Sequence, residues 1–202
     1  MNGTIIGGLQ SPPSAWLGAV VHGAIYLAAT GSQNESLAFQ QLAVSHAAHD
    51  ALDWLFHGTR NYAPTDAALK AVLAPIGINV TSEEGERATQ IGRDAAARVV
   101  VKRANDGINH FVDYVYRPNL PGVYQAIPGG SPLPDTPQAP FVRLFAALGN
   151  VTRFRAPPPP GITDKDYESY VIYVKQQGEQ NSTVRTPFDT DTAYFWRESS
   201  PV

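Results

Sequence analysis

The chain contains no cysteine, a single methionine and few charged residues. Without cysteine it can form neither a disulfide bond nor a thiolate metal site, and it has no cysteine nucleophile. Charged residues make up 16% of the sequence, which is less than the quarter or so usual in soluble domains. We therefore expect an uncharged part of the surface to contact a partner.

The chain also lacks an excess of basic charge and a long apolar run. Its formal net charge is -3 at pH 7, whereas nucleic-acid binding needs clustered Lys and Arg that displace counterions from phosphates. The apolar stretch at residues 15–29 contains His22, lacks a basic flank and is too short to span a bilayer. We expect no nucleic-acid partner and no membrane span, and a buried helix at residues 15–29 rather than a signal peptide.

Apolar residues recur at spacings of three and four along the first half of the sequence, which is typical of amphipathic helices. Four helices are predicted there, with an N-cap at Ser11, a second start at Asn34, and a capping box formed by Thr81 and Glu84. Their expected spans are Ser11 to Gly31, Asn34 to Gly58, Asp66 to Ala74, and Thr81 to the turn at Asp106-Gly107. With 202 residues, the sequence predicts an all-α fold, a helical bundle lobe with a long Pro-rich irregular arm.

Prolines interrupt residues 110–163 too often for long helices, although aromatic residues recur through this arm. Two closing helices follow, one capped by Thr163 and the other opened by Thr186 and Pro187. Their apolar faces are Tyr167, Tyr170, Val171 and Val174, expected to pack as core, and Phe188, Thr192, Phe195 and Trp196. The predicted division is therefore a bundle at 1–109, an arm at 110–163, and closing helices at 164–202 that pack on the bundle or on a missing catalytic lobe.

One cluster on the second helix has the residue types of a metal site: His46, His49, Asp50, Asp53 and His57. Helical spacing places several of these side chains on neighbouring rows, so His46, His49 and Asp53 are the candidate metal ligands. The cluster lacks an H-E-x-x-H pattern, and no distant further ligand can be named. A polar helix face, or histidines packed in a helix interface with their ring nitrogens satisfied, is the favoured interpretation.

Other catalytic patterns are missing from the sequence. There is no G-x-S-x-G elbow, and the pairs Gly7-Gly8 and Gly129-Gly130 lack the context of a phosphate loop, so turn glycines are predicted. A basic side of the fourth helix could bind an anion, or could be a solvated face near the helix C-terminus. It consists of Arg93, Arg98, Lys102 and Arg103.

Five asparagines begin an Asn-x-Ser/Thr glycosylation pattern, more than this Ser and Thr content would give by chance. They are Asn2, Asn34, Asn79, Asn150 and Asn181. The excess favours a secreted or extracellular protein, with a cytoplasmic location as the alternative.

Landmarks along nearly the whole chain resemble, in order and spacing, the N-terminal half of the vanadium-dependent haloperoxidases of the phosphatidic acid phosphatase type 2 superfamily. The early pieces are Ser11-Pro12-Pro13-Ser14, Val21 to Tyr26, Gly92 to Ala97 with Arg103 and Asp106-Gly107, Pro121 to Tyr124, and Phe154 to Ala156. The most specific piece is Tyr167, Val174-Lys175, Gly178, Ser182, Arg185-Thr186 and Ala193 to Trp196.

The resemblance implies a two-lobed helical protein whose C-terminal lobe binds vanadate through a His, a Lys, two Arg and a Ser-Gly-His run. This chain has no Ser-Gly-His, so we expect no cofactor and no catalytic residue in it. The first functional hypothesis is a non-catalytic scaffold lobe that packs against a catalytic lobe in cis or in trans, or forms a homo-oligomer. The second is a free-standing helical binding or interaction protein derived from that lobe, and a metal enzyme using the histidine cluster ranks third.

Overall fold

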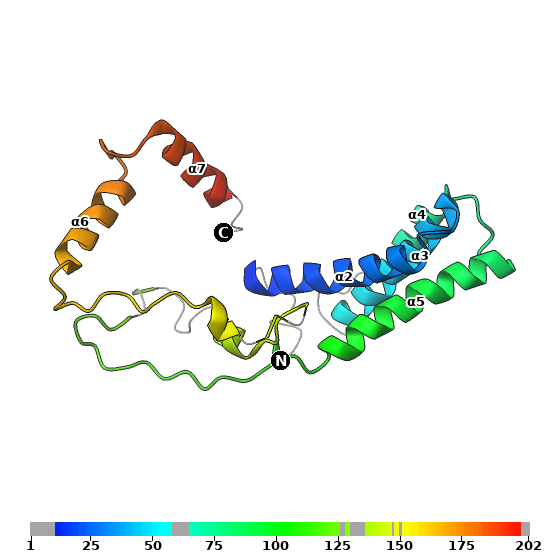
Figure 1. The fold of residues 1–202 in the computed structure, drawn as a ribbon, viewed down its shortest axis with the longest axis horizontal. Coiled ribbons are helices and arrows are strands. Elements are labelled where there is room, and N and C mark those ends of the chain that lie inside the picture. The colour runs from blue at the N-terminus through cyan, green and yellow to red at the C-terminus, as the bar shows by residue number, and fades with distance from the viewer. Residues whose placement is uncertain are drawn as a thin grey trace. The chain divides into compact units, whose positions relative to one another are not determined.

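A computed structural model describes residues 11–57, 65–125, 128–129, 136–146, 148–149 and 151–198 of the chain. These residues form six α-helices, two short 3-10 helices and no β-strand, which confirms the all-α fold (Figure 1). The α-helices are α2 (Ser11–Gly31), α3 (Leu37–Phe56), α4 (Thr65–Leu73), α5 (Glu83–Arg103), α6 (Tyr167–Gly178) and α7 (Pro187–Glu198). The 3-10 helices are η1 (Ala139–Phe141) and η2 (Val151–Phe154). None of the described helices combines the length and the apolar character needed to cross a membrane.

The chain divides into two compact units. The first unit comprises Met1–Phe111 and Gln138–Arg143, and the second comprises Val112–Pro137 and Leu144–Val202. The first unit thus ends near the predicted boundary at residue 109, but it also takes in a short part of the predicted arm. That part is held by the Arg143 amide, which donates to the carbonyl oxygen of Asp106 at 2.7 Å.

The first unit is a helical bundle in which α2, α3 and α5 pack against one another and α4 lies against α3 (Figure 1). Small side chains line these contacts, so the helix backbones approach closely. At Gly92 a Cβ atom would collide with the Ala43 carbonyl oxygen and lie 2.8 Å from the Cβ of His46. The fully buried core side chains include Val20, Ala24, Ala28, Phe39, Leu42, Ala43, Ala47, Ala51 and Ala88.

Two predicted helix starts in the bundle are wrong by a few residues. Helix α3 is capped by Ser36, whose hydroxyl accepts from the Phe39 amide, and not by Asn34. Helix α5 is capped by Ser82, whose hydroxyl accepts from the Gly85 amide. The predicted cap of α5, Thr81, instead donates to the side chain of Asn79 and belongs to the preceding turn. In both cases a nearby Ser is the N-cap because its hydroxyl accepts a hydrogen bond from an amide of the first turn that has no other partner within the helix.

The helix ends follow the sequence pattern more closely. Helices α2 and α6 end at Gly31 and Gly178 as predicted. The turn after α5 contains Gly107 with a φ of +97°, a conformation that a residue with a Cβ rarely adopts. The cap predicted at Ser11 and the stop at Gly58 lie outside the described side chains, as do Gly7-Gly8 and Gly130.

In the second unit, α6 and α7 are joined by a short turn. Helix α7 begins as predicted, because the Thr186 hydroxyl accepts from the Asp189 amide and donates to the Asp189 carboxylate at 2.7 Å. The cap predicted for α6 at Thr163 is wrong. A tight turn in which Asp164 accepts from the Gly161 amide comes first, and α6 starts at Tyr167 after the N-cap residue Asp166.

Candidate functional site

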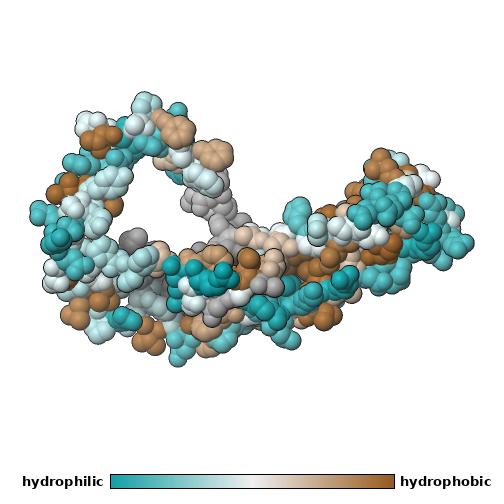
Figure 2. Space-filling view, in the orientation of Figure 1, coloured by the Kyte–Doolittle hydropathy of each residue, from teal (hydrophilic) through white to brown (hydrophobic). Residues whose placement is uncertain are grey.

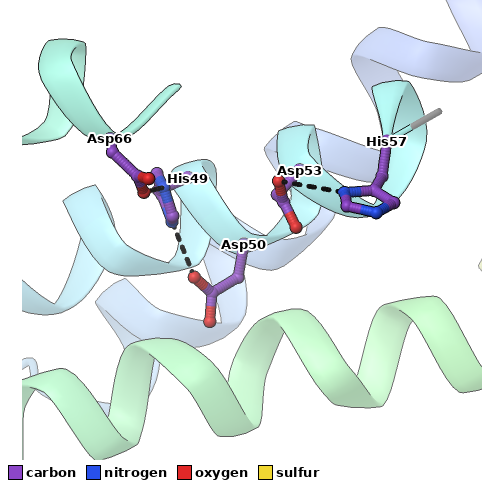
Figure 3. A network of polar contacts seen from close by, with 5 residues as sticks. All are labelled: His49, Asp50, Asp53, His57 and Asp66. Atoms are coloured by element: carbon purple, nitrogen blue, oxygen red, sulfur yellow. Dashed lines mark hydrogen bonds and ion pairs between the residues drawn. The ribbon is translucent and has the colours of Figure 1, made fainter. Parts of the chain in front are cut away.

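A histidine held between two carboxylates connects α3 to α4 (Figure 3). His49 Nδ1 lies 2.8 Å from Oδ1 of Asp50, and His49 Nε2 lies 2.9 Å from Oδ1 of Asp66. His49 and Asp50 are neighbours on α3, whereas Asp66 comes from the first turn of α4. The histidine therefore fixes the start of α4 against the bundle.

The electrostatics of this cluster favour a charged imidazole. Burial by itself lowers the pKa of His49, but its hydrogen bonds to Asp50 and Asp66 and the charges of both carboxylates outweigh that effect and raise the pKa above the ordinary 6.5. An imidazolium donates from both ring nitrogens, so each carboxylate receives a charge-assisted hydrogen bond. With both nitrogens engaged, His49 is suited to hold two helices together rather than to act as a general base.

A cleft with a volume of about 310 Å³ opens beside this histidine, between α3 and α4. Most of its walls are aliphatic, and one residue of α2 completes them. The lining residues are Ile25, Val44, Ser45, Ala48, His49, Leu52, Thr65, Ala68, Leu69 and Val72. The hydroxyl oxygen of Thr65 is buried in this wall without a hydrogen-bond partner.

His46 lies apart from the cluster around His49. It is only 8% exposed and its Nε2 atom has no hydrogen-bond partner. Burial, with help from the charges of Arg93 and His49 and partly opposed by Asp50, lowers the pKa of His46. His46 therefore packs in the interface of α3 with α5, as expected, but the expectation that its ring nitrogens are satisfied there is wrong for Nε2.

The structure does not bring the three candidate metal ligands together. His46 is buried alone, His49 pairs with Asp50 and Asp66, and Asp53 lies 3.8 Å from His57 on the exposed end of α3 (Figure 3). Among the residues described, no group of three or more His, Asp or Glu is arranged to hold a metal ion. The partner that the sequence did not identify is Asp66. The sequence places Asp66 at the start of a predicted helix, but the contact of Asp66 with α3 depends on the tertiary fold.

A second polar network lies at the C-terminal end of α5. The side chain of Asp106 is fully buried and accepts from the Trp16 indole at 2.7 Å and from Arg103. Arg103 also donates to the carbonyl oxygen of Arg143, whose own guanidinium donates to the carbonyl oxygen of Lys102. Arg103 is therefore a buried structural residue. The expectation that it belongs to a solvated or anion-binding face is wrong.

These contacts bear on whether the described residues fit a vanadate ion. Vanadate needs several cationic or hydrogen-bonding groups that converge on its oxygens. The buried guanidinium of Arg103 already faces a carboxylate, whereas Arg93, Arg98 and Lys102 are exposed on α5. These basic side chains of α5 therefore do not converge on a site for vanadate.

Many large side chains of α6 and α7 are exposed in the second unit, and Figure 2 shows hydrophobic side chains scattered among polar ones in this part of the chain. None of the residues of α6 is buried, and none of the described side chains of α7 is buried. The prediction that Tyr170, Val171 and Val174 pack as core is wrong, because they are 53%, 48% and 67% exposed. We call the following residues the aromatic surface: Tyr170, Tyr173, Phe188, Tyr194, Phe195 and Trp196.

Comparison of the chain with protein-family models, with curated proteins and with solved structures finds no match in any of the three.

Proposed function

We propose that this chain is a non-catalytic scaffold lobe of the vanadium haloperoxidase type, whose second unit docks onto a helical catalytic lobe supplied in cis or in trans. Two features support the proposal: the order of the landmark residues in the sequence, and the aromatic surface of α6 and α7. The same residues would equally serve a homo-oligomer, which is the alternative when no catalytic lobe is encoded downstream and none co-purifies with the chain.

The observation that carries the proposal is the exposure of large side chains in the second unit. Phe188, Phe195 and Trp196 are 77%, 68% and 65% exposed. Each such side chain can bury about 150–250 Å², so at these exposures the three together are comparable with the largest apolar patch, a few hundred Å², that soluble monomers usually expose. Side chains of this size gain stabilisation when another surface covers them.

The landmark residues have structural contacts, which also favours a scaffold. Gly92 allows α5 to approach α3, and Arg103 pairs with Asp106 inside the bundle. In the turn between α6 and α7, the Ser182 hydroxyl accepts from the Arg185 amide at 3.0 Å, and the Arg185 guanidinium donates to the Gln177 carbonyl oxygen at 2.7 Å. These residues hold turns and helix contacts in place rather than converging on a cavity.

Sequencing the transcript downstream of the codon for Val202 tests the partner. The proposal expects a Ser-Gly-His run, either in the continuing reading frame or in a separate polypeptide that co-purifies with the chain from its native source. A frame that stops without this run, together with no co-purifying lobe, would overturn the proposal.

An assay of the isolated chain tests the absence of catalysis. We expect no bromination of monochlorodimedone above a no-protein control when vanadate, bromide and peroxide are supplied, because the chain lacks the anion-holding residues of the resembled family. Turnover above the control would show that the chain is itself an enzyme.

A further inference from the structure

Four consecutive prolines, Pro157 to Pro160, lie in the segment that leads from η2 to α6 in the second unit (Figure 1). We call these four residues the proline run. The ring of each proline fixes φ near about −65°, and a residue that precedes a proline is confined to extended ψ values. Ala156 and the first three prolines of the run all precede a proline, and the peptide bonds of the described residues are trans. The proline run therefore forms about one turn of a left-handed polyproline II helix.

The proline run is accessible to a partner. Every residue from 155 to 161 is exposed, and none of residues 155–160 lies in a helix or a turn. Among the described residues, no hydrogen bond involves residues 156–160, so their carbonyl oxygens are free to accept. A polyproline II helix has no internal hydrogen bonds and presents its carbonyl oxygens outward. A partner can therefore contact both the rings and the backbone of the run.

Hydrogen-bonded turns hold both ends of the proline run. Before it, the Arg155 amide donates to the Thr152 carbonyl oxygen at 3.3 Å at the end of η2. After it, the Gly161 amide donates to the Asp164 carboxylate at 2.8 Å, and the Asp164 amide donates back to the Gly161 carbonyl oxygen at 2.9 Å. A segment whose φ angles and ends are already restricted loses little conformational entropy on binding. The run is therefore preorganised as a ligand.

The spacing of the rings and a neighbouring charge indicate the partner. A polyproline II helix has about three residues per turn, so Pro157 and Pro160 lie on one edge, at the Pro-x-x-Pro spacing that aromatic-lined grooves bind. Arg155 is exposed, and none of the ion pairs among the described residues involves it. We propose that the proline run binds a separate protein domain whose groove is lined by aromatic side chains and flanked by a carboxylate that pairs with Arg155. This site is independent of the scaffold function.

Titration of the isolated full chain with an SH3 domain and with a WW domain tests the partner, because both kinds of domain have an aromatic-lined groove. We expect at least one of them to bind saturably in isothermal titration calorimetry. A variant of that domain in which one aromatic residue of the groove is replaced by Ala should bind at least about ten-fold more weakly. Binding by neither domain, or equal binding by the groove variant, would overturn the proposal.

A double substitution tests the edge of the proline run. Pro157→Ala, Pro160→Ala removes two methylene groups at each position and the restriction on φ, so it should weaken binding at least about ten-fold. Its far-UV circular dichroism should match the wild type, because the two rings are exposed. Pro118→Ala is the control, at an exposed proline outside the run, and should leave the affinity unchanged. Equal effects of the two variants would place the bound domain elsewhere and overturn the proposal.

The pairing of Arg155 with a carboxylate is tested by charge removal. Arg155→Gln should weaken binding about two- to five-fold at low salt, the range of an exposed ion pair, and by less at high salt. Arg117→Gln is the matched control, because Arg117 is also exposed but lies far along the sequence from the run. An Arg155→Gln variant that binds like the Arg117→Gln variant at low salt would overturn the role of Arg155.

Discussion

Asp106 is a carboxylate without exposed surface, and its buried charge is balanced by Arg103, whose side chain is 7% exposed. Replacing Arg103 with Met would leave this carboxylate uncompensated. We expect Arg103→Met to lower the free energy of unfolding by about 3–5 kcal/mol, the usual effect of breaking a buried ion pair from one side. Urea denaturation followed by tryptophan fluorescence measures the change.

The double variant Arg103→Met, Asp106→Asn is the control for this prediction. It removes both charges, so it should recover part of the stability that the single variant loses. A single variant that loses less than about 1 kcal/mol would mean that the network does not hold α5 to the rest of the first unit.

The pair of His49 and Asp66 should make the attachment of α4 dependent on pH. Because the pKa of His49 is raised above 6.5 in the folded chain, the stabilising effect of the pair is fully present below pH 6.5 and is lost as the pH rises through the raised pKa. The Asp66 side chain is 88% exposed, so the effect is small. We expect Asp66→Asn to lower the free energy of unfolding by about 0.2–1 kcal/mol near pH 5.5 and by much less near pH 9.

The titration of His46 gives the stability of the folded chain a pH dependence of the opposite sign. This contribution is a background to the measurement on Asp66. The pKa of His46 is lowered in the folded chain, so the unfolded chain takes up the proton first and stability falls as the pH drops below 6.5. Comparing Asp66→Asn with the wild type at each pH cancels this contribution. An equal loss near pH 5.5 and near pH 9 would contradict an ionic attachment of α4.

At the scale of helices, the contact of α3 with α5 depends on the absence of a side chain at position 92. We expect Gly92→Ala to lower the free energy of unfolding by about 1–3 kcal/mol, because the new Cβ collides with the backbone of α3. Gly18→Ala is the control. Position 18 in α2 has nothing within 4 Å of its added Cβ, so this substitution should raise stability by about 0.5–1 kcal/mol. Thermal unfolding of both variants measures the difference, and a neutral Gly92→Ala would show that the helices are further apart.

The helices themselves could be predicted from the sequence, because apolar spacing and helix stops such as Gly31 are local properties. Their starts were less predictable. Thr81 and Ser82 both have capping side chains, and which hydroxyl meets the amide of the first turn depends on how the Asn79 side chain folds the preceding turn. The local sequence thus predicts the bounds of a helix to within a few residues but does not identify the residue that caps it.

The polar clusters could be predicted only in part. Helical spacing groups His46, His49 and Asp53, yet the structure separates them, because His46 turns into the interface with α5 whereas His49 faces α4. The pairing of Arg103 with Asp106 is a contact at a helix end that a solvated-face interpretation does not anticipate. Arg103 and Asp106 are three residues apart, so their pairing is local, but the contacts with Trp16 and Arg143 that bury them depend on the tertiary fold, as does the contact of His49 with α4.

At the scale of the whole molecule, the glycosylation pattern predicts how the protein is processed. Asn34 and Asn181 are exposed in turns between helices, and Asn79 is exposed before α5, whereas Asn2 and Asn150 lie outside the described residues. We expect Asn34 and Asn181 to be glycosylated when a eukaryotic host secretes the protein. Mass spectrometry before and after glycosidase treatment decides this. Efficient secretion without a mass change at either site would count against an extracellular protein.

The aromatic surface of α6 and α7 predicts how the isolated chain behaves in solution. Ring centroids of Phe195 and Trp196 lie 5.5 Å apart in an edge-on contact, and both rings remain exposed. If a second lobe covers these rings in the assembled protein, the isolated chain has to cover them by self-association. Val101, which is 78% exposed on α5, offers a matched apolar position outside this surface.

Light scattering on the purified chain tests this docking role most directly. We expect the wild type to exceed the monomer mass of 21.8 kDa, the Phe195→Ser, Trp196→Ser double variant to become monomeric, and Val101→Ser to behave like the wild type. A monomeric wild type whose double variant loses thermal stability would contradict the account, because the aromatic side chains would then belong to the core of this chain.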